Sequence, residues 1–494
     1  MKIDKTEETA IKNAIEQLYF KGIYEGNIEL LRKIFHKDAL LFGDIKGVPY
    51  YKTAAQYIEG VGSRVSPEKS GKDFKPTIIS IDVINTIATA KLNVKMYDFN
   101  YYNFITFHKI DGKWLIVNKT LTDVELKQIF STKIIKIMWN KNRITDLLGI
   151  EYPVFQGPFG GGLSTVELTT TVSKLGGLGG YGAYTLSPQE IYDVHQQIKS
   201  ITDKPYNLNL WVNDHDIIDQ EHTENQYKKA VEIFKPYYDS LSIEVPPLPP
   251  SFESRFQNQL QVIFDIKPKV FSFMFGLLDP NIIERLKNQG TIVVGNATTV
   301  DEAIALENIG VDVIAASGFE SGGHRPSFFD KAELSTTGTF ALIQLVKDKV
   351  KTPLVAAGGI ANGRGISAAM TLGAEAVQIG TAFLATEESG ALPIHKEFLF
   401  SEAAKFTTLS RAYTGRLGRG ITTEITRKLL TATDQTLPFP LQTTFMASMR
   451  KAALEQKKHE LVFFWSGQIA PILKHKNAST LMKSLIEEAN ELMG

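Results

Sequence analysis

A histidine preceded by closely spaced glycines is the residue in this sequence best suited to proton chemistry. His324 lies in ASGFESGGHRPSF (316–328), directly after an apolar run that begins at Val311, and three glycines precede it: Gly318, Gly322 and Gly323. Glycine is costly to order, so this spacing indicates a backbone that bends tightly or lies against a ligand. Because imidazole changes charge near neutral pH, His324 is the candidate base or anion-binding group. A purely structural histidine is the other interpretation.

Glycines also end two later apolar runs, TPLVAAGGI and AEAVQIGTAF. Gly358 and Gly359 close the first, and Gly380 and Thr381 follow the second. Glycine lets backbone amides approach a phosphate, and a helix that starts after such a loop adds its positive end. The two tips therefore predict a phosphate site, the alternative being that these glycines only make tight turns.

Two other segments supply groups for a planar ring. The run YPVFQ ends in QGPFGGG, which places Gln156, Gly157 and Pro158 at a loop that proline stiffens, as suits contact with a flat ring. In YNLNLWV, Asn207 and Asn209 share one side of an alternating strand, where an amide can bond a ring or ribityl group or satisfy loop backbone. A phosphate site, groups that contact a planar ring and one histidine together predict a flavin mononucleotide (FMN) site.

The elements that must position these residues form a strand–helix rhythm from Asn142 onward. Eight apolar runs alternate with helix-like segments, which predicts a (β/α)8 TIM barrel over 142–494 with its site at the carboxyl ends of the strands. The segments 213–268 and 384–450 read as insertions before a final helix. An open doubly wound sheet is the alternative architecture.

Residues 1–126 predict a smaller α+β domain, joined to the barrel by a connector over 127–141. Apolar residues at helical spacing open it, and Asn27 is placed to cap a second helix, IELLRKIF. Four strand-like runs follow from Thr77, and Asp111-Gly112 is a hairpin signal between the last two.

Composition narrows the function classes. Lys+Arg and Asp+Glu balance at 54 each, which gives no global field for nucleic acid or an anionic membrane. The chain has no cysteine, and no apolar stretch approaches the roughly 20 residues of a membrane span. Its nine histidines lack metal-ligand spacing. We expect a soluble cytoplasmic protein that uses no metal and binds neither nucleic acid nor membrane.

Residues 142–430 resemble the nitronate monooxygenase family, formerly called 2-nitropropane dioxygenases. The matching motifs, in family order, are QGPFGGGLSTVEL, NLNLWV, FSFMFG, ASGFESGGHRPSF, LVAAGGIANGRG and LGAEAVQIGTAFLATEESG. The resemblance implies FMN in the barrel and His324 as catalytic base. It departs from the family pattern at Ser317, where glutamine is frequent, and at Pro326, where glycine is common. With the resemblance included, the predicted flavin-binding set is Gln156, Gly157, Asn209, Ser317, Gly322, Gly358, Gly359, Gln378, Ile379, Gly380 and Thr381.

The first domain resembles the SnoaL-like, putative lumazine-binding group of cone-shaped domains. The carrying residues are FHKDALLFG (35–43), YYKTAAQYIEG (50–60) and YYNFITFHKIDGKWLIVNKTL (101–121). The resemblance implies an inner cavity, which His36, Asp38 or Tyr101 could line. A dimerising or accessory module is the other interpretation, so a homodimer is among the expected states.

The expected activity is FMN-dependent oxidation of an alkyl nitronate or nitroalkane by O2 to a carbonyl compound and nitrite. The resemblance also admits FMN-dependent reductases that use NAD(P)H on an enoyl-acyl-carrier protein or a quinone, and a non-enzymatic flavin sensor. Arg325 is predicted to assist an anion or to face solvent. The basic run RAYTGRLGRG (411–420) is predicted to be a solvated loop, with a cover over the site as the alternative.

Overall fold

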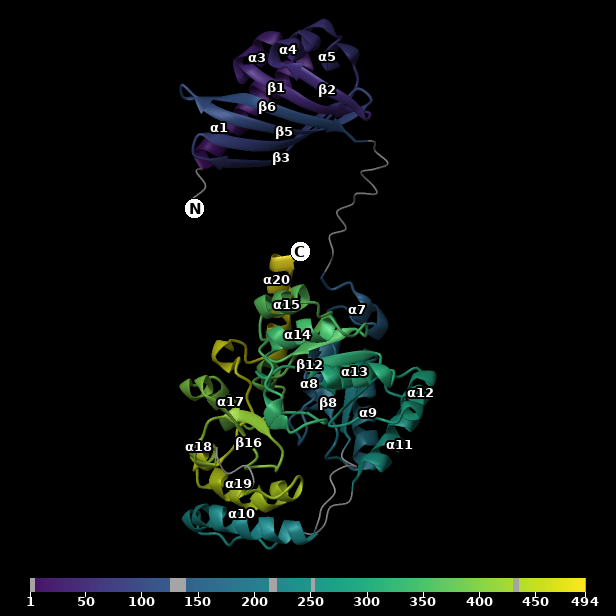
Figure 1. Cartoon of the computed structure of the whole chain (residues 1–494), viewed down its shortest axis with the longest axis vertical. Helices are drawn as coiled ribbons and strands as arrows, with labels where there is room; N and C mark the ends of the chain where they lie inside the picture. The colour runs from purple at the N-terminus through teal and green to yellow at the C-terminus, as the bar shows by residue number, and fades with distance from the viewer. Residues whose placement is uncertain (1–4, 125–138, 213–219, 250–253, 430–434, 494) are drawn as a thin grey trace. The chain divides into compact units, whose positions relative to one another are not determined.

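The chain folds as two compact units, which meet in sequence at Lys136 and Ile137 (Figure 1). The structure, a computed structural model, describes residues 5–124, 139–212, 220–249, 254–429 and 435–493. Most of the predicted connector therefore lies outside the described residues. Along the part that is described, no helix combines the length and the apolar character that a bilayer crossing requires.

The first unit is a six-stranded sheet with helices beside it, as the α+β prediction requires. Strand order is β2-β1-β6-β5-β4-β3, and every neighbouring pair is antiparallel except β1 with β6. Its elements are α1 (Lys5–Ala14), η1 (Ile15–Phe20), α2 (Lys21–Glu25), α3 (Ile28–Ile34), β1 (Phe35–Ile45), β2 (Val48–Thr53), α4 (Ala54–Ser63), α5 (Pro67–Ser70), β3 (Phe74–Ile84), β4 (Ile87–Met96), β5 (Phe99–Ile110) and β6 (Lys113–Asp123).

Local signals in this unit act as predicted. The Asn27 side chain accepts a hydrogen bond from the Leu30 amide and caps α3. Asp111 and Gly112 both have positive φ, 47° and 77°, and turn β5 into β6 with Ile110 opposite Lys113. The first two strands were not predicted, because β1 carries polar residues that interrupt the alternation of a strand.

The second unit is a closed parallel barrel, and the open-sheet alternative is wrong. Eight strands follow the order β7-β15-β14-β12-β11-β10-β9-β8, and a parallel bridge from Phe155 to Leu178 joins the two ends. The strands are β7 (Val154–Gln156), β8 (Gly179–Gly182), β9 (Tyr206–Trp211), β10 (Val270–Met274), β11 (Ile292–Ala297), β12 (Val313–Ser317), β14 (Leu354–Ala357) and β15 (Ala376–Ile379).

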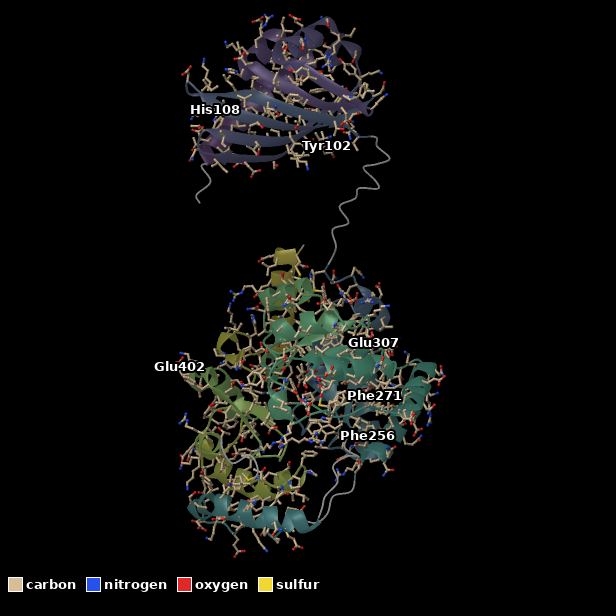
Figure 2. The ribbon with its side chains drawn as sticks, viewed as in Figure 1. Tyr102, His108, Phe256, Phe271, Glu307 and Glu402 are labelled. Atoms are coloured by element: carbon tan, nitrogen blue, oxygen red, sulfur yellow. The ribbon has the colours of Figure 1, made fainter. Side chains whose placement is uncertain are left out.

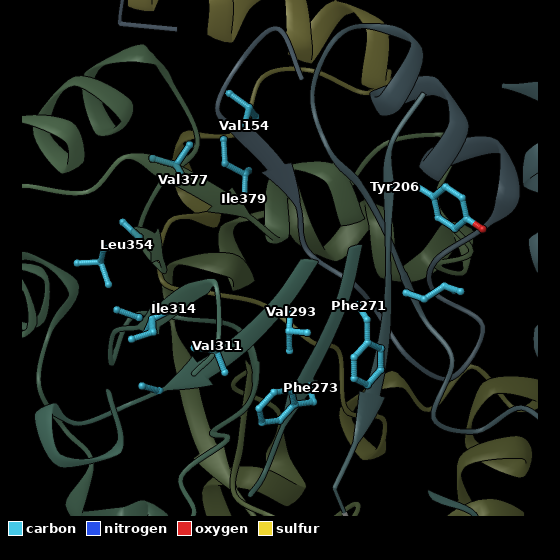
Figure 3. Packing of buried hydrophobic residues seen from close by; sticks show 14 of the residues in the cluster. Val154, Tyr206, Phe271, Phe273, Val293, Val311, Ile314, Leu354, Val377 and Ile379 are labelled. Carbon is cyan, nitrogen blue, oxygen red and sulfur yellow. The ribbon is translucent and has the colours of Figure 1, made fainter. Parts of the chain in front are cut away.

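Alternating side chains along these strands build two apolar layers. One layer packs outward onto the barrel helices and includes Val154, Ile314 and Val377 (Figure 3). Their neighbours Phe155, Val313 and Ala376 belong to a second cluster, which contains helix residues only from α7 (Arg143–Leu148) and thus fills the interior.

The predicted barrel helices are present. They include α8 (Val166–Lys174), α9 (Pro188–Ile201), α12 (Pro280–Asn288), α13 (Val300–Asn308), α14 (Thr339–Lys347) and α15 (Gly363–Thr371), with α20 (Ala478–Met493) at the end of the chain. Helix α11 (Phe256–Ile266) also packs on the barrel, although it lies in the segment 213–268 that was predicted to be an insertion. Phe256 of α11 and Phe271 of β10 are both buried in the outer layer (Figure 2).

The two predicted insertions pack together. Helix α10 (Gln220–Ser240) shares an apolar cluster with residues 384–470, in which Phe234 and Phe445 meet edge to face. The lobe at the second insertion extends beyond the predicted 384–450. It holds α16 (Thr381–Leu384), α17 (Pro393–Leu399), η3 (Glu402–Lys405), β16 (Thr407–Ser410), β17 (Gly418–Ile421), α18 (Glu424–Lys428), α19 (Leu441–Glu455), η4 (His459–Leu461) and η5 (Ala470–Ile472). Strands β16 and β17 form a small sheet with β13 (Gly323–His324) and so connect this lobe to the histidine segment.

Candidate active site

A cavity of 410 Å³ opens at the carboxyl ends of the barrel strands, where such barrels carry their chemistry. Nine of the twelve predicted site residues line it: Gly157, Ser317, Gly322, His324, Gly358, Gly359, Gln378, Gly380 and Thr381. These residues come from the ends of four strands, β7, β12, β14 and β15, and from the segment that follows β12. The structure thus brings together residues more than two hundred positions apart in sequence.

The remaining three predicted residues do not line this cavity. Gln156 accepts a hydrogen bond from the Gly180 amide at 2.8 Å and donates to the Gly157 carbonyl, so its side chain serves backbone at the junction of β7 and β8. Asn209 donates to Ser272 at 2.9 Å, while its Oδ1 is buried with no hydrogen-bond partner among the described residues. Ile379 is in the outer apolar layer.

Contacts of both its backbone and its side chain hold His324 in place. Its backbone lies opposite Gly418 in the β13–β17 pair, and Nε2 lies 2.9 Å from Oγ1 of Thr414. The imidazole also contacts the rings of Trp211 and Trp465, with centroids 5.1 and 4.7 Å away. His324 is half-buried and lines the cavity.

This environment keeps His324 neutral at physiological pH. Burial among aromatic rings and, second, the charge of Arg416 lower the pKa of His324 to about 3. The Arg416 guanidinium lies over the Phe275 ring at 3.9 Å and over the Phe439 ring at 4.7 Å. The site therefore combines a neutral imidazole, which can accept a proton, with a nearby fixed cation.

The glycines before His324 have two structural roles. Gly323 has a φ of +78°, the left-handed bend that glycine adopts without strain. At Gly318 a Cβ would lie 2.0 Å from Oγ1 of Thr339, and at Gly322 it would lie 2.5 Å from the Gly467 amide nitrogen. Close backbone packing therefore requires these two, and Gly322 also borders the cavity.

The two glycine tips leave space for a ligand at Gly359 and Gly380, whereas a Cβ at Gly358 would lie 2.5 Å from Oγ of Ser321. A Cβ at Gly380 would meet only the Phe159 ring at 3.9 Å, and one at Gly359 would meet the Glu320 side chain at 3.5 Å. Helix α15 begins close after the first tip, capped by Asn362, whereas α16 after the second is a single turn of four residues. The positive end of a helix is thus contributed mainly by α15.

Another residue that lines the cavity has a polar atom without a partner among the described residues. Asn296 of β11 donates to Oγ of Ser317 at 3.0 Å, and its Oδ1 is buried without a hydrogen-bond partner in the described segments. A polar ring edge would satisfy it. Open glycine tips, an orphaned amide and an aromatic wall therefore fit a planar, phosphate-bearing cofactor.

The prediction that Arg325 faces solvent is wrong, and Arg325 is not among the residues that line the cavity, where it could assist an anion. Its side chain is 2% exposed and donates to the carbonyls of Ser317, Gly318 and Ser335 at 3.1, 2.6 and 2.7 Å. Burial is the main reason that its pKa falls to about 10, so it remains charged. Arg325 is an internal support of the histidine loop, because its planar group satisfies carbonyls that the tight turn leaves unpaired.

The run 411–420 is not a solvated loop. Leu417 and Arg419 are buried, and Tyr413 and Thr414 line the cavity beside His324. The alternative, a cover at the site, agrees with this placement. Sequence reasoning missed Thr414 and the aromatic wall of Trp211, Tyr184 and Trp465; the aromatic stretch VFFWSG (462–467) was the available signal.

The fold and this site define a (β/α)8-barrel enzyme. Residues 141–488 match the family described as nitronate monooxygenase, and residues 6–122 match the family described as putative lumazine-binding. A probable nitronate monooxygenase of Staphylococcus aureus (strain JH9) is 36% identical over 357 residues, which cover 72% of this chain and 99% of the relative. The chain belongs to the nitronate monooxygenase family and is a flavin-dependent oxidoreductase, as the sequence predicted.

Solved structures extend the comparison. A nitroalkane oxidase from Streptomyces ansochromogenes is 30% identical with a TM-score of 0.65, covering 71% of this chain and 98% of the other. FabK from Thermotoga maritima is 28% identical with a TM-score of 0.55, covering 71% and 97%. The barrel is thus similar to two differently named enzymes, a nitroalkane oxidase and FabK.

Proposed function

We propose that the barrel, residues 142–494, binds FMN and oxidises alkyl nitronates, with O2 as acceptor, to a carbonyl compound and nitrite. The observation that carries this proposal is the neutral His324 imidazole, which lines the cavity and lies within reach of the positive charge of Arg416. A nitronate is a small anion, and its parent nitroalkane carries an acidic C–H bond. The neutral imidazole suits the nitroalkane, whose proton it can accept, and the positive charge of Arg416 suits the nitronate anion.

Residues on three sides would hold FMN. The glycine tips at Gly358-Gly359 and Gly380-Thr381 offer backbone amides to the phosphate, and Gly157 and Asn296 border the space for the ring. When bound, the flavin would take up the two electrons of the substrate. The protein itself supplies the position, the shielding from water and the proton chemistry.

His324 would remove the proton of a neutral nitroalkane. Its low pKa keeps the imidazole unprotonated and ready to accept, and the negative charge that forms on the substrate then favours the imidazolium. With a nitronate this step is absent, and His324 only orients the substrate. Arg416, held by the Phe275 and Phe439 rings, supplies the positive potential for either anion.

The test is a turnover assay on the purified protein. We expect mass spectrometry of the released cofactor to identify FMN, and we expect propyl-2-nitronate to yield nitrite while O2 is consumed. FAD in place of FMN would refute the cofactor assignment. Consumption of O2 without nitrite would refute the reaction.

A reductase is the second candidate, favoured by the 28% identity and near-complete coverage of FabK. Such an enzyme would accept a hydride from NAD(P)H, so rapid oxidation of NADH with an enoyl thioester or a quinone would support it. The positive charge of Arg416 near His324 favours the small anionic substrate instead, because a substrate that is already an anion gains more from a nearby fixed charge than a neutral quinone or enoyl thioester does.

A further inference from the structure

The first unit contains a cavity of its own, lined only by residues of that unit. A cavity of 140 Å³ lies between its helices and one face of the sheet. Every charged side chain that lines it is cationic: Lys52, Arg64 and Lys119. Of the residues predicted to line a pocket in this unit, Tyr101 does so, whereas His36 and Asp38 do not.

Lys119 occupies a position that an apolar residue would normally fill. It lies on the buried face of β6 between Ile116 and Leu121 and is 4% exposed. Its Nζ is 3.4 Å from the Tyr57 hydroxyl and 4.5 Å from the Tyr57 ring centroid, and no Asp or Glu is among the described residues that line the cavity. A buried ammonium without a counter-charge is costly, so its presence needs a reason.

Arg64 adds a second cation to the same space. It follows α4 as its C-terminal cap, and its Nε and Nη2 are buried without hydrogen-bond partners within the described ranges. Burial and the charge of Arg64 lower the pKa of Lys119 to about 7, which shows that the two cations act on each other. Nearby Asp123 accepts a hydrogen bond from the Lys46 amide and does not line the cavity.

We propose that this cavity binds a small organic anion whose carboxylate lies between Lys119 and Arg64. The tyrosines that line the space, Tyr19, Tyr50, Tyr57 and Tyr101, provide ring faces for an apolar body and hydroxyls for a polar substituent. The volume is close to the roughly 150 Å³ that accommodates benzene in a protein interior, so a single-ring carboxylate fits. Neither the proposed barrel reaction nor its substrate is assumed.

The affinity should depend on pH through Lys119. Burial raises the pKa of all four tyrosines, so these remain neutral. Bound anion favours protonated Lys119. Affinity is therefore highest below about pH 7 and falls as the free protein loses that proton at higher pH.

The experiment is calorimetric titration of the full-length, flavin-loaded protein with benzoate, and with benzamide as the neutral isostere. We expect benzoate to bind at least about tenfold more tightly than benzamide, because only the anion forms charge-assisted hydrogen bonds. Lys119→Met should abolish that preference. Lys113→Met, an exposed position at the start of the same strand, should leave it unchanged.

Several outcomes would overturn the proposal. These are no benzoate binding at millimolar concentration, equal affinities for the two probes, or binding that survives Lys119→Met. Benzoate that occupies the barrel would change the flavin absorption spectrum and persist in this variant. Lys119→Met removes an uncompensated buried charge, so its melting temperature should not fall; if it fails to fold, Arg64→Met provides the same test.

Discussion

Nε2 of His324 lies 2.9 Å from Oγ1 of Thr414, a contact between residues ninety positions apart. The same hydroxyl is 3.2 Å from the Arg416 carbonyl and 3.3 Å from the Arg416 amide. One short turn therefore orients the imidazole and also carries the cation that lowers its pKa. The Thr414 hydroxyl can donate its proton to Nε2 of His324 or to the Arg416 carbonyl. Which of the two it donates to determines whether Nε2 accepts or donates, and therefore which imidazole nitrogen carries hydrogen.

Thr414→Val should weaken catalysis without loss of the cofactor. The methyl group replaces the hydroxyl at equal size, so the imidazole loses its hydrogen-bond partner, and kcat/KM for a neutral nitroalkane should fall about tenfold. The flavin spectrum should stay unchanged. Thr371→Val, at an exposed position on α15, is the matched control. Unchanged kinetics in Thr414→Val would show that this contact does not position the base.

Arg416→Met should raise the pKa of His324 toward its usual value. In the unmodified protein the base stays neutral well below pH 6.5, so kcat/KM for a nitroalkane should fall only at strongly acidic pH. The variant should lose activity at a higher pH, because an imidazole with a higher pKa is protonated sooner on acidification. It should also show a raised KM for nitronate. Arg427→Met serves as an exposed arginine control. An acid limb at the same pH in both proteins would contradict the role of Arg416.

Arg325→Met should destabilise the barrel. Loss of the guanidinium leaves the carbonyls of Ser317, Gly318 and Ser335 buried without their donor, at about 1–3 kcal/mol for each unpaired group. Chemical denaturation would measure the change against Arg364→Met, whose arginine is exposed on α15. Stability equal to that of the control would show that Arg325 does not support the histidine loop.

Removal of residues 1–126 should leave flavin binding intact. All eight strands of the barrel and all of the cavity that holds His324 come from later residues. The absorption spectrum and the released cofactor of the truncated protein provide the measurement. A folded barrel without flavin would show that the proposed domain boundary is functionally wrong.

The sequence predicted the barrel well because its strands are buried apolar runs that end in glycines and its helices have strong periodicity. It predicted the strand-end residues of the site for the same reason, since the carboxyl ends of parallel strands meet at one edge. It failed for β1, whose polar residues interrupt the alternation, and for Arg325, which looks like a surface cation until the carbonyls around it are known. Thr414 and Trp465 reach His324 only through tertiary contacts, which local pattern does not contain.

Two substrates distinguish whether His324 acts as a base or only anchors the anion. In His324→Ala, turnover of neutral nitroalkanes should fall far more than turnover of the corresponding nitronates, because only the former need a proton removed. A positioned base contributes about 10²–10⁴-fold, which sets the expected difference. Equal losses on both substrates would make His324 an anchor for the anion.

The central claim is that the substrate itself reduces the flavin, and anaerobic mixing tests it most directly. Stopped-flow absorbance should show rapid bleaching of the oxidised flavin by propyl-2-nitronate, and slow or no bleaching by NADH or NADPH. The physical reason is that the nitronate is an electron-rich anion attracted by Arg416 and oriented by His324, so no external reductant is required. Rapid bleaching by NADH with no response to nitronate would contradict this account and place the protein with the reductases.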